Sequence, residues 1–161
     1  MGPADTPPTS VVIRPNFDTI ARPFDTITDE QWNDAWETPM RDTVAELQAA
    51  FRGGARRIVV IVPTIAMSGG TCHVHLAAPA EAVRVLVKSA ARQWGRHGVT
   101  VNAVAVAPED FDVDPSIAGP TSLAPPALAD RDPTALIEFL CSEAAGDVTG
   151  QTIVVDGGVW M

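Results

Sequence analysis

The feature that most constrains this chain is the stretch from Arg57 to Val106, which predicts a strand, a helix and a second strand. The run IVVIV at 58–62 is unbroken and β-branched, as in parallel strands that are buried on both faces. A helical apolar stripe follows, formed by Val83, Leu86, Val87, Ala90, Ala91 and Trp94. The run VTVNAVAV at 99–106 predicts the second strand. Such a unit joins two parallel strands of one sheet by a right-handed crossover.

The flanking segments continue this alternation of strands and helices. The sequence VVI at 11–13 predicts a short first strand, and the capping box from Thr28 to Gln31 predicts the start of a helix over 29–52. The apolar stripe of that helix is Trp32, Trp36, Met40, Val44, Leu47 and Phe51. A further helix begins at Asp132-Pro133, with proline at its first position, and runs to Gly146; a last strand covers 151–158. The pattern predicts an α/β fold with about four parallel strands and helices on both faces.

We expect one domain, covering residues 11–161. A proline-rich lead at 1–10 precedes it, and we expect that lead to be poorly ordered. Residues 107–133 contain six prolines and predict a long loop or lid.

Composition excludes several classes of protein. The formal net charge of −9 argues against a nucleic-acid partner. No apolar run approaches the roughly 18–20 residues of a membrane helix, and the first ten residues lack the features of a secretory signal. Two cysteines suit a reducing cytoplasm, where we expect the protein to reside. The basic residues of the second helix recur every four positions, as on a solvated helix face: Arg84, Lys88, Arg92 and Arg96.

Four segments together resemble the short-chain dehydrogenase/reductase family. They are ITDEQW (27–32), RRIVVIV (56–62), AARQWGRHGVTVNAVA (90–105) and VTGQTIVVDGGVWM (148–161). The likeness runs in unbroken order from residue 11 to 161. It implies a Rossmann-type fold, NAD(P)-linked carbonyl or alcohol chemistry, and oligomers built from two helix pairs.

The chain departs from this family at its front. Family members open with a nucleotide-binding half that carries a glycine-rich turn, whereas this sequence starts at about the family's fourth strand. No G-x-G-x-x-G is present, and the glycine pairs at 53–54, 69–70 and 157–158 are typical of turns. We therefore expect a partial Rossmann-type fold without the front half, and no cofactor bound by this chain alone.

The second departure concerns the family's catalytic residues. The alignment places Pro39, Pro63, Leu76 and Ala80 at the Asn, Ser, Tyr and Lys positions. A one-residue shift brings Thr64 to the Ser position or His75 to the Tyr position, but it supplies no lysine. The chain has no tyrosine, and Lys88 is its only lysine. Hydrocarbon side chains transfer no proton, so we expect no family-type catalytic residue and no redox reaction on this chain alone.

Two other clusters have alternative interpretations. Cys72, His73 and His75 are either a nucleophile with a histidine base or ordinary polar loop residues; they are too few for a zinc site. Glu109, Asp110, Asp112 and Asp114 are either cation ligands or a solvated acidic loop, with a spacing unlike the calcium-loop pattern. We expect no metal at either cluster.

These observations favour a catalytically degenerate subunit that stabilises or completes an intact NAD(P)-dependent reductase of the same family. The resemblance implies contact through helices 29–52 and 80–95 and through the C-terminal helix and strand, with NAD(P) held by the partner. One alternative is a self-assembling protein that binds a small molecule, or a cofactor-independent lyase or hydrolase using the 63–76 loop. Another is a composite dinucleotide site completed by a partner. We do not expect an autonomous NAD(P)-dependent oxidoreductase; the alternatives are an enzyme of another kind and a part of an oxidoreductase complex.

Overall fold

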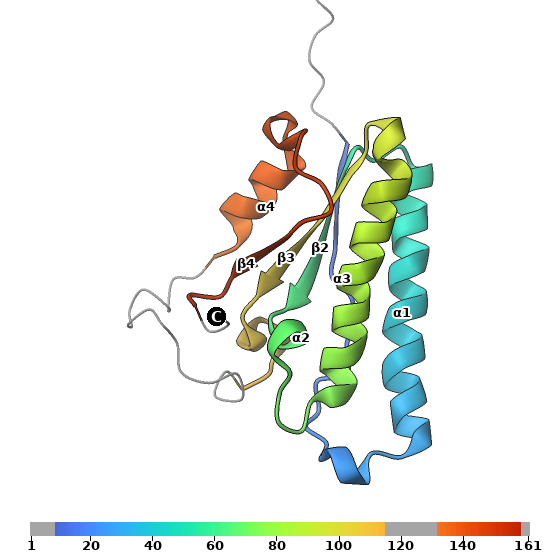
Figure 1. Ribbon diagram of the computed structural model, residues 1–161, viewed down its shortest axis with the longest axis vertical. Coiled ribbons are helices and arrows are strands. Elements are labelled where there is room, and N and C mark those ends of the chain that lie inside the picture. The colour runs from blue at the N-terminus through green and yellow to red at the C-terminus, as the bar shows by residue number, and fades with distance from the viewer. Residues whose placement is uncertain (1–8, 115–131, 159–161) are drawn as a thin grey trace, which may run out of the picture.

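Four parallel strands form one sheet in the order β1–β2–β3–β4 in the computed structural model, which describes residues 9–114 and 132–158 (Figure 1). The strands are β1 (Ser10–Ile13), β2 (Arg57–Pro63), β3 (Thr100–Val106) and β4 (Thr152–Val155). The β2–β3 ladder pairs seven residues, from Arg57 with Thr100 to Pro63 with Val106. The outer strands each pair four residues, β1 with β2 and β4 with β3. The predicted α/β class and parallel sheet are confirmed.

Helices cover the sheet on both faces. They are α1 (Asp29–Arg52), α2 (Ile65–Ser68), α3 (Val74–Trp94) and α4 (Thr134–Cys141). Short 3₁₀ turns occupy Phe24–Thr26, Gly95–His97, Pro108–Phe111 and Glu143–Ala145. The helices α1 and α3 pack side by side on one face, and α4 lies on the other (Figure 1).

The helix α1 has the predicted bounds but not the predicted buried face. Its capping box forms as expected: Gln31 N donates to Thr28 Oγ1 over 3.2 Å, and Thr28 N donates to Gln31 Oε1 over 3.1 Å. Pro39 lies inside the helix, where it removes one backbone donor without ending the helix. The buried residues of α1 are Ala35, Pro39, Thr43, Leu47 and Ala50. Of the predicted apolar stripe only Leu47 is fully buried, because small residues let α1 approach its neighbours closely.

The helix α3 begins six residues before the expected residue 80. A short helix, α2, precedes it where only a turn was expected, and Gly69 ends α2 with a φ of +71°. The early start places Leu76 and Ala80 inside α3, where both are fully buried. The glycines at 69–70 predicted only a turn after β2, but one helical turn, α2, fits between β2 and Gly69.

The C-terminal elements also differ in detail from the prediction. Pro133 precedes α4 rather than opening it, and Asp132 Oδ1 accepts a 2.8 Å hydrogen bond from Thr134 N. The helix ends at Cys141, and a 3₁₀ turn fills the remainder to Gly146. The predicted lid at 107–133 lies largely outside the described residues, as does most of the lead at 1–10. The described beginning of the predicted lid is packed, since Phe111 and Val113 are buried. At the end of the predicted lead, Ser10 already belongs to β1.

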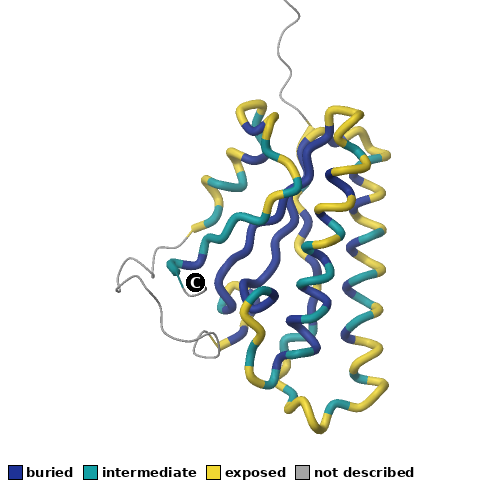
Figure 2. The backbone as a smooth tube through the Cα atoms, in the orientation of Figure 1, coloured by how far each residue is buried: buried dark blue, intermediate teal, exposed yellow. Residues whose placement is uncertain are grey.

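The core is centred on β2 and β3. Every residue of these two strands is buried, whereas β1 and β4 are only partly covered (Figure 2). Among the described residues, β1 pairs on one side only, with β2. Val12 of β1 is 48% exposed. The sheet therefore ends at β1 in an edge whose outward backbone groups lack a strand partner within the described part of the chain.

Candidate functional site

The candidate site lies at the carboxyl end of β2, where α2, the loop to α3 and the loop after β1 meet. Ligands of open α/β sheets bind at this end of the strands. The structure places Pro63 as the last residue of β2 and Pro39 within α1, both buried. Leu76 and Ala80 lie in the first turns of α3 and belong to the hydrophobic core. All four positions that the resemblance assigns to catalytic residues therefore carry buried hydrocarbon.

Thr64 is the hydroxyl residue nearest to the expected Ser position. Its backbone N–H donates to Val106 O over 2.8 Å, which extends the β2–β3 pairing by one bond. Its hydroxyl oxygen is fully buried and has no hydrogen-bond partner among the described residues. The hydroxyl is thus an unsatisfied polar group inside the core rather than a group presented to a ligand.

His75 lies beside the expected Tyr position and is 1% exposed. Its Nε2 lies 3.0 Å from the carbonyl oxygen of Ile20. A carbonyl only accepts, so Nε2 carries the proton and Nδ1 has a bare lone pair. Nδ1 is buried without a partner within the described chain. Burial lowers the pKa of His75, against the opposing charge of Asp18, so the ring is neutral at pH 7.

His73 is adjacent to His75, but Cys72 is paired with neither. The two imidazole rings are stacked, with centroids 6.2 Å apart and an interplanar angle of 19°. An extended segment would place both histidines on one side, but the segment is not extended: His73 is the N-cap residue of α3, and the helix begins at Val74. The two rings nevertheless lie next to each other. Among the described residues no hydrogen bond joins the Cys72 thiol to either ring. The cysteine–histidine pair considered from the sequence therefore does not form.

An ion pair between Asp18 and Arg22 completes the cluster. Arg22 donates to Asp18 Oδ2 through Nη2 at 2.8 Å and through Nε at 3.2 Å. Burial opposes ionisation of Asp18, but hydrogen bonds from Arg22 and from the Ile20 N–H outweigh it and lower its pKa. The Arg22 N–H also donates to Cys72 O over 2.7 Å. Sequence reasoning missed the contact of this loop with His75, since 55 positions separate Ile20 from His75 and no local pattern links them.

The acidic residues after β3 fold back onto the end of β1. The Arg14 guanidinium donates to the carbonyl oxygen of Asp110, and it lies 4.3 Å from the centroid of the Phe111 ring. Burial raises the pKa of Asp110, with Arg14 opposing. Among the described residues, no three or more His, Cys, Asp or Glu side chains group in a way that could hold a metal ion.

The described residues do not match the requirements of a nicotinamide cofactor. Pro63, Leu76 and Ala80 offer neither a hydroxyl nor an ammonium group to a ribose or a carbonyl oxygen. Within the described part, none of the first three strands leads through a glycine-rich turn into a helix. A hollow of about 210 Å³ beside Pro39 is smaller than typical small-molecule sites of roughly 300–1,000 Å³. We derive no reaction step through this cofactor.

Comparisons with known sequences agree on one kind of relative. The family model described as enoyl-(acyl carrier protein) reductase matches residues 10–160. The 3-oxoacyl-(acyl-carrier-protein) reductase FabG of Vibrio harveyi is 31% identical over 144 residues, which cover 83% of this chain and 59% of that protein. An A-factor type gamma-butyrolactone 1'-reductase of Streptomyces virginiae is 34% identical over 74% of this chain and 49% of its own length. The chain thus spans roughly half to three fifths of these relatives.

Solved structures agree on the fold. A levodione reductase matches with a TM-score of 0.74 and 18% identity, over 93% of this chain and 66% of that one. A protein described as a dehalogenation enzyme matches with a TM-score of 0.71 and 23% identity, over 94% and 68%. Within the described residues, no helix is both long and apolar enough to span a membrane.

Proposed function

The chain belongs to the short-chain dehydrogenase/reductase family, and from this premise we propose that it is a non-catalytic subunit of an intact NAD(P)-dependent relative. The partner is of the 3-oxoacyl reductase type, and this chain stabilises or completes it. One observation supports the proposal most: the four positions that the resemblance assigns to catalytic residues hold buried Pro39, Pro63, Leu76 and Ala80. Such a site cannot exchange a proton with a substrate.

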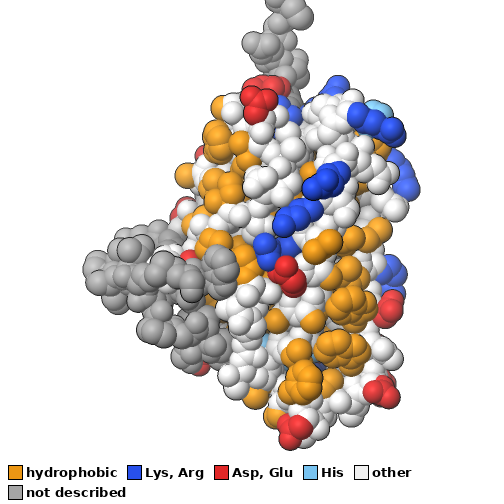
Figure 3. Space-filling model, in the orientation of Figure 1, with side chains coloured by type: hydrophobic (Ala, Val, Ile, Leu, Met, Phe, Trp, Pro, Cys, Tyr) orange, Lys and Arg blue, Asp and Glu red, His pale blue; other side chains and the backbone are white. Residues whose placement is uncertain are grey.

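The outer side of α1 and α3 supports association. Five large apolar residues of α1 are only partly buried or exposed: Trp32, Trp36, Met40, Val44 and Phe51. A groove of about 170 Å³ runs between the two helices, lined in part by Val44, Leu86 and Trp94. Hydrophobic side chains gather over the same two helices in the space-filling view (Figure 3). Exposed apolar patches of this kind mark protein–protein contacts.

The free edge of β1 offers a second place of contact. Parallel sheets are normally continued or covered, and Val12 lies exposed on this strand. A partner that adds a strand to β1 satisfies the outward backbone groups and covers Val12. In this proposal the partner also supplies the nicotinamide site, and this chain alone binds no NAD(P).

The test is the assembly state, measured by size-exclusion chromatography with light scattering. The purified chain is examined alone and after co-expression with a complete reductase of this family from the same genome. We expect a defined hetero-oligomer. We also expect Val85→Glu to weaken it by at least tenfold in dissociation constant, since one buried uncompensated charge costs more than 1.4 kcal/mol. Val85 is 55% exposed and lies one and two helical turns before the groove residues Ser89 and Gln93.

Ala49→Glu is the matched control. It adds the same charge on an exposed position of α1 that does not line the groove. The control should leave the oligomer unchanged. A monomeric chain that never joins the reductase contradicts the proposal, as does equal weakening by both variants.

A second candidate function rests on the buried polar atoms of the 63–76 loop. The bare Nδ1 of His75 is the group that cofactor-independent lyase or hydrolase chemistry could use as a base. Turnover of a carbonyl, epoxide or thioester substrate that is lost in His75→Ala or Cys72→Ala would favour it. Titration of NADPH fluorescence with the chain alone and with the complex separates both candidates from a composite dinucleotide site. Signal from the chain alone would contradict the proposed division of roles.

A further inference from the structure

A row of cations runs along α3 in a chain whose net charge is −9. Arg84, the first of the row, is already engaged: its guanidinium contacts Glu81, and its Nε donates to Thr152 Oγ1 over 3.2 Å. Lys88 and Arg92 follow at intervals of four residues and are exposed. Neither has an ion-pair partner in the described part of the chain. Two cations without local compensation thus lie next to each other on one side of the helix.

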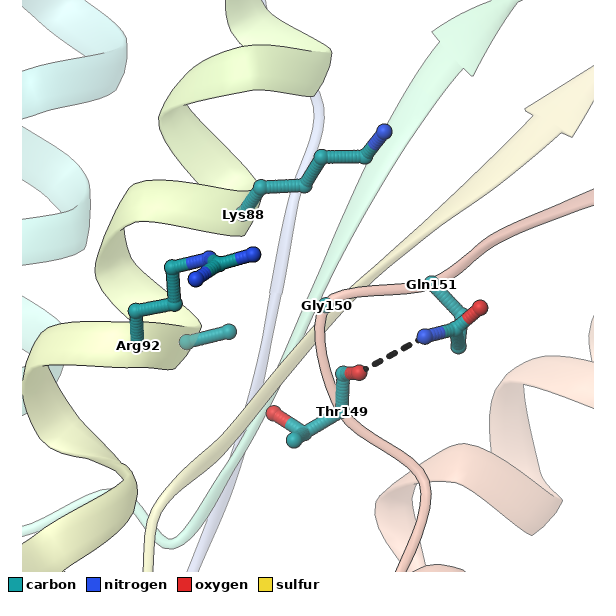
Figure 4. Close-up of a pocket in the computed structure, with 6 residues that line it drawn as sticks. Lys88, Arg92, Thr149, Gly150 and Gln151 are labelled. Carbon is teal, nitrogen blue, oxygen red and sulfur yellow. Dashed lines mark hydrogen bonds between the residues drawn. The ribbon is translucent and has the colours of Figure 1, made fainter.

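Lys88 and Arg92 line a hollow of about 410 Å³ between α3 and the turn before β4. Arg92 extends from the helix toward the 149–151 turn, and Lys88 extends from the same side of the helix over the neighbouring strands (Figure 4). Ala91 of the helix and Gly150 of the turn line the hollow where the two walls come closest, and a Cβ at Gly150 would lie 3.5 Å from the Cβ of Ala91. Thr149 and Gln151 complete the lining and supply a hydroxyl and an amide.

The wall opposite the helix is held rigidly. The Gly150 N–H donates to Val101 O over 2.8 Å, and Thr149 Oγ1 accepts a 3.2 Å hydrogen bond from Val101 N. Asn102, which is fully buried, donates through Nδ2 to Val148 O over 2.8 Å and accepts at Oδ1 from Gln151 N over 3.1 Å. Gly150 has a φ of +69°, which disfavours any side chain there. The turn is therefore preorganised, and only the two cationic side chains need to be ordered on binding.

We propose that this hollow binds a phosphate group of a small phosphorylated molecule. An ammonium and a guanidinium on one side provide several charge-assisted donors to phosphate oxygens. The volume of about 410 Å³ accommodates more than the phosphate alone and falls in the usual range for small ligands. The acidic charge of the whole chain disfavours a long polyanion, which would pass over repelling surface. The site lies on the C-terminal half of α3, away from the buried cluster around His75.

The test is isothermal titration calorimetry of the full chain at 150 mM NaCl. The probes are inorganic phosphate, inorganic pyrophosphate and adenosine 5′-monophosphate, with acetate as a carboxylate. We expect one site with a submillimolar dissociation constant for the monophosphate or pyrophosphate and weaker binding of inorganic phosphate. Tighter binding of adenosine 5′-monophosphate would indicate a nucleotide-like ligand, and tighter binding of pyrophosphate would indicate that the site recognises phosphate groups alone. Equal binding of acetate, which would show an adventitious ion only, or no binding of either favoured probe would overturn the proposal.

Variants locate the site. Lys88→Ala and Arg92→Ala should each weaken binding by roughly tenfold or more, since a hydrogen bond to a charged group contributes on the order of that factor. Arg96→Ala is the control, because Arg96 belongs to the same row but does not line the hollow. All three positions are exposed, so the variants should keep their circular dichroism and melting temperature. Equal loss in all three variants, or no loss in the first two, contradicts the proposal. The calorimetric results do not depend on the proposed assembly with a reductase, because the assembly state is measured separately by chromatography with light scattering.

Discussion

Leu76 and Val85 are both aliphatic residues of α3, yet they belong to two regions of opposite character. Leu76 lies at the position that the resemblance assigns to the family's proton donor, and it is fully buried in the core. Val85 lies on the outer side of the helix and is 55% exposed. The region expected to face a ligand is thus packed like a core, whereas Val85, which lies outside the predicted apolar stripe of this helix, faces outward. The comparison shows that the packing of this fold is kept with hydrocarbon side chains at the positions that the resemblance assigns to the catalytic residues.

The largest expected difference between the two regions is in stability. Leu76→Ala should lower the free energy of unfolding by about 3 kcal/mol, the usual cost of a cavity at a buried leucine. Val85→Ala should change it by less than about 0.5 kcal/mol, since it removes an exposed side chain. Urea denaturation of both variants measures the difference. Equal effects would show that the start of α3 is not packed as described.

The second prediction concerns the pH dependence of stability near His75. Its pKa in the folded state lies below the unfolded value near 6.5, so the unfolded chain binds the proton more readily. The stability contributed by the neutral ring is complete above pH 6.5 and is lost as the pH falls toward the folded pKa. One such group gives a slope of at most about 1.4 kcal/mol per pH unit.

Unfolding midpoints between pH 7.5 and 5 in His75→Gln, compared with the parent chain, measure this contribution. The variant should flatten the slope over that range. His97→Gln, at an exposed position after α3, is the matched control and should leave the slope in place. A parent chain that gains stability on acidification through this range would contradict the assigned burial.

The smallest expected effect is at Thr64. Thr64→Val removes a buried hydroxyl that has no partner within the described chain, so it should be neutral or stabilising by up to about 1 kcal/mol. Thr149→Val removes a hydroxyl that accepts from Val101 N, and it should destabilise by about 1 kcal/mol. Thermal melts should therefore show a lower melting temperature for Thr149→Val and an unchanged or higher one for Thr64→Val. A clear loss of stability in Thr64→Val would indicate that its hydroxyl has a role in the native state.

Much of the fold could be predicted because its signals are local. The β-branched runs of β2 and β3 and the capping residues Thr28 and Gln31 each depend on neighbours a few positions away. The buried face of α1 could not be predicted in this way. Its large residues and its small residues recur at similar spacing, so periodicity alone cannot tell which set faces the sheet. Only the close approach of α1 to the rest of the fold favours Ala35, Thr43 and Ala50.

The sequence predicted which types of residue the candidate site contains, but not which groups those residues contact. The absence of tyrosine, and of any lysine besides Lys88, is visible in the sequence. The contact of His75 with Ile20 depends on how the loop after β1 returns over α3, which no short-range pattern encodes. The hollow beside Lys88 was missed for a similar reason, since the row of cations alone is typical of a solvated helix face.

The ladder between β2 and β3 has a consequence for how the native molecule opens. Its seven pairs are covered on all sides, while the four pairs of each outer strand are not. Amide protons of β2 and β3 should therefore exchange with deuterium only through global unfolding, and those of β1 and β4 through smaller local fluctuations. Local opening should therefore begin at the outer strands β1 and β4. A partner or ligand that binds at either strand should also slow this opening.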